Sequence, residues 1–150
     1  MATFRTPTVT QRLQAAEALC RASGARFTPM RREVYAHMLA AAAPLSAYDL
    51  LDGLKRHLGK PLAPPTVYRA LEFLLEQGLI HRVESTHAYL TCAHPGEDHQ
   101  SLYLVCTECG TTQELDDHQI GGLLQQRARK SHFKPRKQVV ELQGTCEKCS

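Results

Sequence analysis

The sequence predicts an α+β fold in which an N-terminal winged helix-turn-helix domain precedes a small αβ domain with a four-cysteine zinc site. Three observations support this prediction. Helix caps and apolar residues at helical spacing dominate the first 78 residues. Strand-like alternation follows them. Two C-x-x-C pairs, CTEC at 106–109 and CEKC at 146–149, lie in the second half of the chain.

Length and composition limit the class of protein. The chain has 150 residues, of which 43% are hydrophobic, enough for one large domain or two small ones. It contains no run of eighteen apolar residues, and its first thirty residues contain no apolar segment. We therefore expect no membrane span and no secretory signal, and a cytoplasmic location. Cysteines there stay reduced, and clustered thiols in that compartment usually bind metal.

Charge is distributed unevenly. Residues 1–84 carry eleven Lys/Arg against seven Asp/Glu, whereas the remaining residues carry seven against eight. A basic first half suits an anionic partner, although an ordinary solvated surface would explain the same excess.

Four helices are expected before residue 79, at about 8–23, 28–42, 46–59 and 65–78. In the first, Cys20 shares an apolar face with Leu13 and Ala16, so we interpret it as a core residue. Thr28 stands before a proline as an N-cap, and Ser46 stands three residues before an acidic residue as in a capping box.

Strands are expected in LIHRVES, HAYLTC, SLYLVC, TTQEL and KQVVELQGTC. The first two form a hairpin with a turn near 85–86. Asp116 is expected to cap a further helix to about Lys130, which Gly121 and Gly122 weaken by roughly 2 kcal/mol. We place the domains at 1–90, which includes the hairpin, and 91–150.

The fourth helix has the pattern of a recognition helix. An apolar stripe must pack inward, with Thr66, Tyr68 and Arg69 opposite it near the helix N-terminus. Such a helix presents its first residues to base edges, and Arg can bind guanine bidentately. Arg31 and Lys60 could contact phosphates. These residues predict binding to double-stranded DNA; the alternative is an ordinary helical hairpin with solvated side chains.

The two C-x-x-C pairs predict a structural zinc site. Cys106, Cys109, Cys146 and Cys149 can supply four thiolates in tetrahedral geometry. Thirty-six residues separate the pairs, so the metal would clamp the last strand onto the earlier cysteine turn. A redox dithiol is the alternative, but two equally spaced pairs favour zinc.

A second zinc site could combine His81, Cys92, His99 and Glu114. These residues come from both sides of the expected domain boundary. His94 is an alternative to His99, and either could be an exposed loop residue. With Glu114 as a base instead of a ligand, the set could belong to a zinc hydrolase or deaminase, but HPGE and VCTEC do not fit the deaminase motifs. A purely structural zinc module is the other alternative.

PPTVYRALEFLLEQGLIHRVEST, SAYDLL, RFTPMRREV and the two C-x-x-C pairs together resemble the ferric-uptake-regulator (Fur) family, in particular its zinc-responsive members. The resemblance covers nearly the whole chain. It implies a DNA-binding domain joined to a dimerisation domain, and a homodimeric metal-dependent repressor without enzymatic activity.

The resemblance also implies two zinc ions per chain. The four cysteines would hold the structural one, and His81, Cys92, His99 and Glu114 the regulatory one; Tyr68 and Arg69 would read bases. The His-rich clusters typical of the family's iron and peroxide sensors are missing, which favours zinc as the metal. The resemblance then implies control of zinc uptake genes; a sensor of another metal is the alternative.

Overall fold

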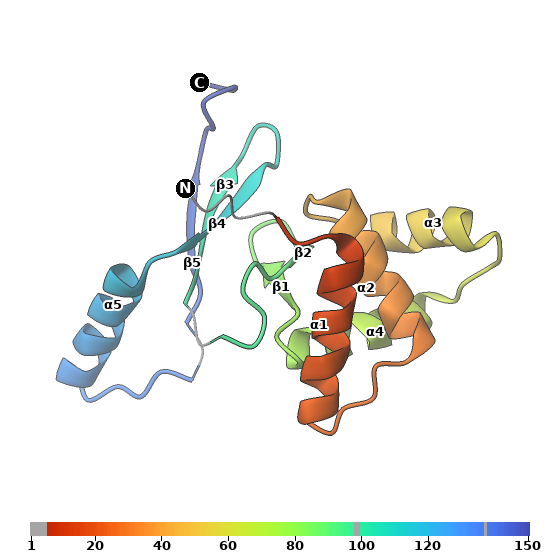
Figure 1. The fold of residues 1–150 in the computed structure, drawn as a ribbon. Coiled ribbons are helices and arrows are strands. Elements are labelled where there is room, and N and C mark those ends of the chain that lie inside the picture. Colours follow the sequence, from red (N-terminus) through yellow and green to blue (C-terminus); the bar gives the residue numbers. More distant parts are fainter. Residues whose placement is uncertain (1–5, 98–99, 137) are drawn as a thin grey trace. The chain divides into compact units, whose positions relative to one another are not determined.

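A computed structural model describes residues 6–97, 100–136 and 138–150 (Figure 1). The chain divides into two compact units, the first ending at Gly96 and the second beginning at Glu97. In the described part of the chain, no helix is both long and apolar enough to cross a bilayer.

The first unit contains four helices where the sequence predicts them: α1 (Val9–Ala22), α2 (Pro29–Ala41), α3 (Ala47–Leu58) and α4 (Pro64–Glu76). The caps expected at Thr28 and Ser46 form, and Thr8 caps α1 in the same way. The side chains of Thr8, Thr28 and Ser46 each accept a hydrogen bond from a backbone N–H in the first turn. Gly59 then ends α3 in a left-handed conformation, with φ of 64°.

A single apolar core joins the four helices. Leu50 and Leu54 of α3 are completely buried and face α4, where Leu74 is also fully buried. Cys20 is 0% exposed, which confirms it as a core residue. Phe73 of α4 is buried as well. This core fixes α4, so that the opposite face of the helix is available to a ligand.

A short hairpin completes the first unit. Strands β1 (Ile80–Val83) and β2 (Ala88–Thr91) are antiparallel. Leu45, just before α3, extends this sheet, because Leu45 and Tyr89 exchange two backbone hydrogen bonds of 2.9 and 2.8 Å. The hairpin is thereby attached to the helix pair α3–α4, as in a winged helix-turn-helix, which confirms the predicted fold class.

The second unit is built on a three-stranded sheet: β3 (Ser101–Cys106), β4 (Thr112–Asp116) and β5 (Val140–Gly144), in the order β4-β3-β5. The central strand β3 is antiparallel to β4 and parallel to β5. Cys106 is in register with Gly144, two residues before Cys146. The parallel pairing therefore brings both C-x-x-C segments to the same end of the sheet.

Helix α5 (His118–Lys130) lies between β4 and β5 in the sequence. The expected cap at Asp116 is wrong, because that residue still belongs to β4. Asp117 is the cap, and its carboxylate accepts hydrogen bonds from the N–H groups of Gln119 and Ile120 at 2.9 and 3.2 Å. Strand pairing continues one residue further than the sequence pattern indicated.

Side-chain amides connect α5 to the rest of its unit. Gln125 of α5 donates to Gln138, and Gln138 donates to Gln100, both at 2.8 Å. Gly121 lies on the same side of the helix, and a Cβ atom there would be 1.3 Å from Oε1 of Gln100. A Cβ on Gly122 would have no neighbour within 4 Å. Only the first of the two adjacent glycines is therefore required by packing.

We expect opposite effects from alanine at these two glycines. Gly122→Ala should raise the free energy of unfolding by roughly 1 kcal/mol, because alanine is the better helix former and has open space. Gly121→Ala should lower it, because the Gln100 amide must leave its place between α5 and Gln138. Calorimetric melting of both full-length, zinc-loaded variants measures the difference; stabilisation by both would show that the close approach at Gly121 is unimportant.

Candidate metal centres and DNA-reading helix

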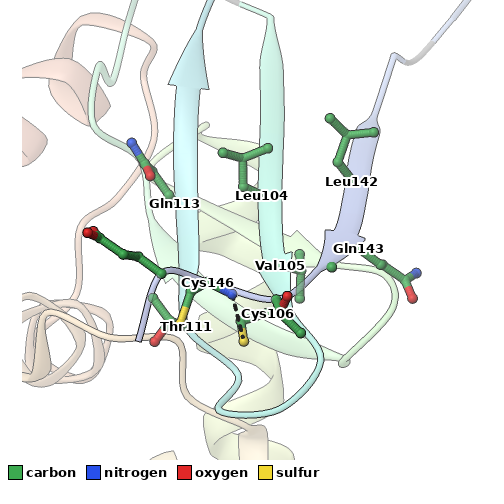
Figure 2. Close-up of a pocket in the computed structure, with 11 residues that line it drawn as sticks. Leu104, Val105, Cys106, Thr111, Gln113, Leu142, Gln143 and Cys146 are labelled. Atoms are coloured by element: carbon green, nitrogen blue, oxygen red, sulfur yellow. Dashed lines mark hydrogen bonds between the residues drawn. The ribbon is translucent and has the colours of Figure 1, made fainter. Parts of the chain in front are cut away.

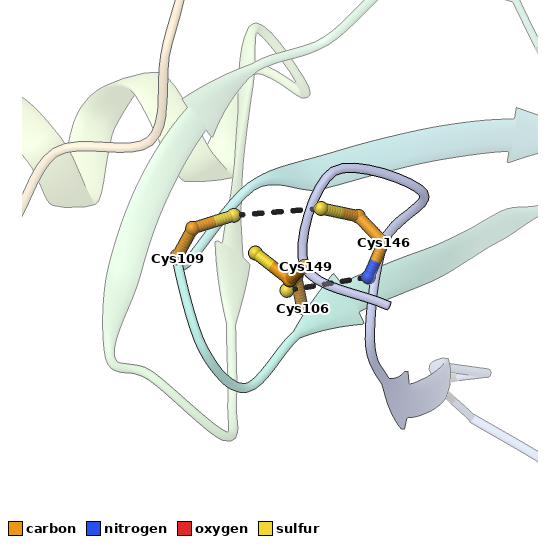
Figure 3. A group of neighbouring side chains, drawn as sticks. All are labelled: Cys106, Cys109, Cys146 and Cys149. Carbon is orange, nitrogen blue, oxygen red and sulfur yellow. Dashed lines mark hydrogen bonds between the residues drawn. The ribbon is translucent and has the colours of Figure 1, made fainter.

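Two tight turns position the four cysteines (Figure 3). Cys106 ends β3 and Cys109 follows in the next turn, where the Gly110 N–H donates to the Cys106 carbonyl at 3.0 Å. Cys146 and Cys149 form an equivalent turn after β5, where the Cys149 N–H donates to the Cys146 carbonyl at 2.9 Å. The side chains of both turns point toward one another.

The sulfur positions match a tetrahedral metal site. All four Sγ atoms lie within 4.8 Å of one another, and those of Cys109 and Cys146 are 3.7 Å apart. Zinc–sulfur bonds of about 2.3 Å require sulfur–sulfur separations of about 3.8 Å in a tetrahedron. The four thiols predicted from the two motifs thus form a cluster that could hold zinc.

Hydrogen bonds to sulfur distribute the protons of this cluster unequally. Backbone N–H groups, first that of Cys109 and then that of Cys146, lower the pKa of Cys106 to about 6. Hydrogen bonding with the Cys146 and Cys109 sulfurs raises the pKa of Cys149 to about 12. At neutral pH Cys106 is therefore ready to bind a metal as thiolate, whereas Cys149 must first lose a proton. Acid should weaken metal binding, because protons compete for the same sulfurs.

A cavity of about 350 Å³ borders the thiol cluster (Figure 2). Leu104 of β3 and Leu142 of β5 line it together with Gln113 of β4, and Cys106 and Cys146 lie at one end. Leu142 is 58% exposed. The cavity therefore leaves apolar surface of the sheet open to solvent beside the cysteines.

The structure brings His81 and Cys92 of the second predicted set together. A ring nitrogen of His81 and Sγ of Cys92 lie within 4.8 Å of each other, and Cys92 is completely buried. His81 pairs with Leu90 across the hairpin, so Cys92, two residues further, is its diagonal neighbour on the same face. Glu114 is on β4 of the second unit, opposite Tyr103. His94 is exposed in the loop after β2, and His99 is outside the described residues.

Helix α4 presents the expected polar face. Tyr68 is 51% exposed and Arg69 is exposed, while Val67 before them and Ala70 after them are buried. Thr66 is half-buried at the start of the helix, and Lys60 is exposed in the loop before it. No side chain caps the N-terminus of α4, and no acidic residue lies in its first turn. The positive end of the helix dipole is therefore not neutralised there.

Arg31 is held within the first unit. Its guanidinium lies 3.8 Å from the centre of the Phe73 ring, in a cation–π contact, and donates to the carbonyl of Arg26. This position connects α2 to the buried side of α4. No sequence pattern indicates this contact, because Arg31 and Phe73 are far apart along the chain.

Arg12 is a second residue that sequence reasoning did not identify. It extends from α1, and its Nη2 donates to the backbone carbonyl of Cys92 at 2.5 Å. Arg12 and Cys92 are eighty positions apart in the sequence, so no local pattern could have revealed this hydrogen bond.

A winged-helix unit with an exposed reading face, followed by an αβ unit with a four-thiol cluster, defines the class of metal-binding transcription regulators. The sequence profile of the Ferric uptake regulator family matches residues 22–143. This chain belongs to that family.

Its relatives include zinc-dependent members. The chain is 42% identical over 144 residues to the zinc uptake regulation protein of Escherichia coli, covering 95% of this chain and 84% of the relative. It is 30% identical over 131 residues to that of Mycobacterium tuberculosis, covering 85% and 97%. A solved structure of a zinc uptake regulator complexed with zinc and DNA superposes with a TM-score of 0.87 at 39% identity, covering 96% of both chains. All three of these relatives are described as regulators of zinc uptake.

Removing one thiol should remove the metal from the cysteine cluster. We expect Cys149→Ser to lose about one zinc per chain and to melt at a lower temperature, because three thiolates and a hydroxyl bind zinc poorly and structural zinc contributes folding free energy. Cys20→Ala is the matched control: it removes a thiol from the core of the first unit and should retain all zinc. Metal analysis after dialysis against a weak chelator would contradict the assignment if Cys149→Ser kept the parent's zinc content.

Proposed function

We propose that this protein is a zinc-responsive transcriptional repressor, active as a homodimer, that binds operator DNA when a regulatory zinc site is filled and controls zinc uptake genes. The observation that carries the proposal is the exposed pair Tyr68 and Arg69 on a rigidly packed helix, in a chain that also has a four-thiol cluster. The relatives described as zinc uptake regulators support the choice of zinc. Its place of action would be the cytoplasm.

In this proposal residues 1–90 form the DNA-binding domain and 91–150 the dimerisation and metal-binding domain. Arg69 reads a base edge, with Tyr68 and Thr66 beside it in the major groove. Lys60 contacts phosphate. Arg31, whose guanidinium lies over Phe73 of the reading helix, is assigned a second phosphate contact.

Two zinc ions per chain have different roles. The four cysteines hold the structural ion. His81, Cys92, His99 and Glu114 hold the regulatory ion, for which the closeness of His81 and Cys92 is the supporting geometry. One thiolate and one carboxylate together balance the charge of a divalent cation. Because these ligands come from both sides of the domain boundary, their joint binding would restrict how the two domains move.

Zinc regulates DNA binding only through a difference in affinity. The ion must bind the DNA-competent arrangement more tightly than the others, and DNA must then raise the affinity for zinc by the same factor. In the competent dimer, two recognition helices reach successive major grooves about 34 Å apart.

The second unit has an apolar surface suited to a second copy of the chain. Ile120, Leu123 and Leu124 of α5 are 42–52% exposed, and Leu142 of β5 is 58% exposed. The opposite side of α5 faces its own unit through Gly121 and Gln125. A helix whose apolar side points away from its own unit is expected to bury that side against a partner.

Arg69 and Lys60 should differ in how they affect DNA binding. Arg69→Ala should weaken operator binding by roughly 1–3 kcal/mol and relax discrimination at one base pair. Lys60→Ala should weaken all sequences alike and make the salt dependence shallower by about one unit of log–log slope. Both are exposed cations, so each is the other's control. Titrations of specific and scrambled duplexes at several salt concentrations, at buffered free zinc, test this; equal losses on both duplexes for both variants would mean that α4 does not read bases.

Cys92→Ser should separate sensing from folding. Serine has a similar size but is a far weaker zinc ligand at neutral pH, and the site would lose one negative charge. The four clustered cysteines stay intact, so we expect a folded protein with about one zinc per chain and little response of DNA binding to zinc. Metal content and operator affinity are measured across buffered zinc, with iron and manganese as controls. A variant that binds two zinc ions and responds like the parent would place the regulatory site elsewhere.

A further inference from the structure

Helix α1 contacts the segment that carries Cys92. Arg12 donates from α1 to the carbonyl of Cys92, and the next residue, Leu13, is buried in the core. The family profile begins at residue 22, the last residue of α1. The contact therefore comes from a part of this chain outside the pattern that defines the family.

The Cys92 peptide is held from both directions. Its N–H donates to the carbonyl of Leu79 at 2.9 Å, while its carbonyl accepts the bond from Arg12 at 2.5 Å. Cys92 follows the last residue of β2, and the register of the hairpin ends at Thr91. The bond to Leu79 extends the hairpin pairing by one residue, Arg12 holds the carbonyl beyond it, and the Cys92 side chain is directed toward His81.

The bond from Arg12 forms in a poorly hydrated place. Arg12 is half-buried, and the completely buried hydroxyl of Tyr35 is near its guanidinium. Burial raises the pKa of Tyr35, and the positive charge of Arg12 opposes that rise. A hydrogen bond from a cation to a carbonyl is stronger in such surroundings than in water.

We propose that Arg12 is a positioning residue for the regulatory zinc site: by holding the Cys92 peptide, it keeps Sγ next to His81 and raises the affinity of the site for zinc. The proposal rests on the regulatory site proposed above. Helix α1 would thereby help to set the zinc concentration at which this protein responds.

Two effects of Arg12 have opposite signs. Its positive charge disfavours a nearby cation, whereas its hydrogen bond restricts the ligand to a productive position. Loss of a group that orients a metal ligand typically costs 10- to 100-fold in metal affinity. Arg12 bonds to the peptide and not to the sulfur. We therefore expect a loss at the lower end of that range, about tenfold.

The test compares three variants of the full-length protein loaded with structural zinc. Arg12→Gln removes the charge, and Arg12→Lys keeps the charge and the aliphatic stem but loses the planar fork. Arg21→Gln is the control. Arg21 lies on the same helix, and in the described structure its guanidinium forms a surface ion pair with Glu17, with 3.4 Å between Nη2 and Oε1. Competition with a zinc chelator gives the affinity of the second site, and cobalt substitution gives the thiolate charge-transfer band.

Both Arg12 variants should bind the second zinc about tenfold more weakly and show a weaker or shifted cobalt–thiolate band, with melting temperature close to that of the control. If Arg12→Gln does not fold, Arg12→Lys decides. Zinc affinities equal to or tighter than that of Arg21→Gln would overturn the positioning role. A parent protein that binds only the zinc of the cysteine cluster would instead refute the regulatory site itself.

Discussion

The parallel pairing of β3 with β5 is the constraint on which the second unit depends. It places Cys106 beside Gly144, so that two cysteine turns separated by thirty-six residues meet at one end of the sheet. Strand β4 returns the chain to the end of the sheet where β3 begins, and α5 with its flanking loops then carries it past β3 to the start of β5. Without this pairing the chain would have two C-x-x-C turns but no four-thiol cluster.

The two units are stabilised in different ways. The first has a continuous core to which all four helices contribute. In the second, α5 meets its surroundings through glutamine amides, and several apolar side chains of α5 and β5 are exposed. Strand pairing, the cysteine cluster and a partner must therefore supply stability that an apolar core supplies in the first unit. The apolar core thus supports the first unit, whereas the second unit offers its cysteine cluster as a site at which a metal could add stability.

Two arginines of the first unit support its fold, whereas the residues proposed for DNA recognition stay exposed. Arg31 bonds to Arg26 and lies over Phe73, and Arg12 bonds to Cys92, so both arginines fix backbone or core elements. Tyr68, Arg69 and Lys60 remain exposed. Charge counting over residues 1–84 cannot distinguish these roles, since a guanidinium held in the protein and one that faces DNA contribute equally to the sum.

The sequence by itself determined where the helices lie and which four cysteines form the cluster. The caps at Thr28 and Ser46 and the 3.6-residue apolar period are local signals, so the helices are where the pattern predicts them. The repeated C-x-x-C spacing limited the chemistry of the four thiols before any geometry was known. The end of β4 and the cap of α5 were misplaced by one residue, because hydrogen bonding across the sheet, and not the local pattern, decides where a strand ends.

Only the tertiary structure showed that Gly121 makes room for Gln100, that Arg31 packs on Phe73, and that Arg12 holds the Cys92 peptide. Each of these joins residues that are distant in sequence, and such contacts leave no periodicity or motif from which a single sequence could reveal them.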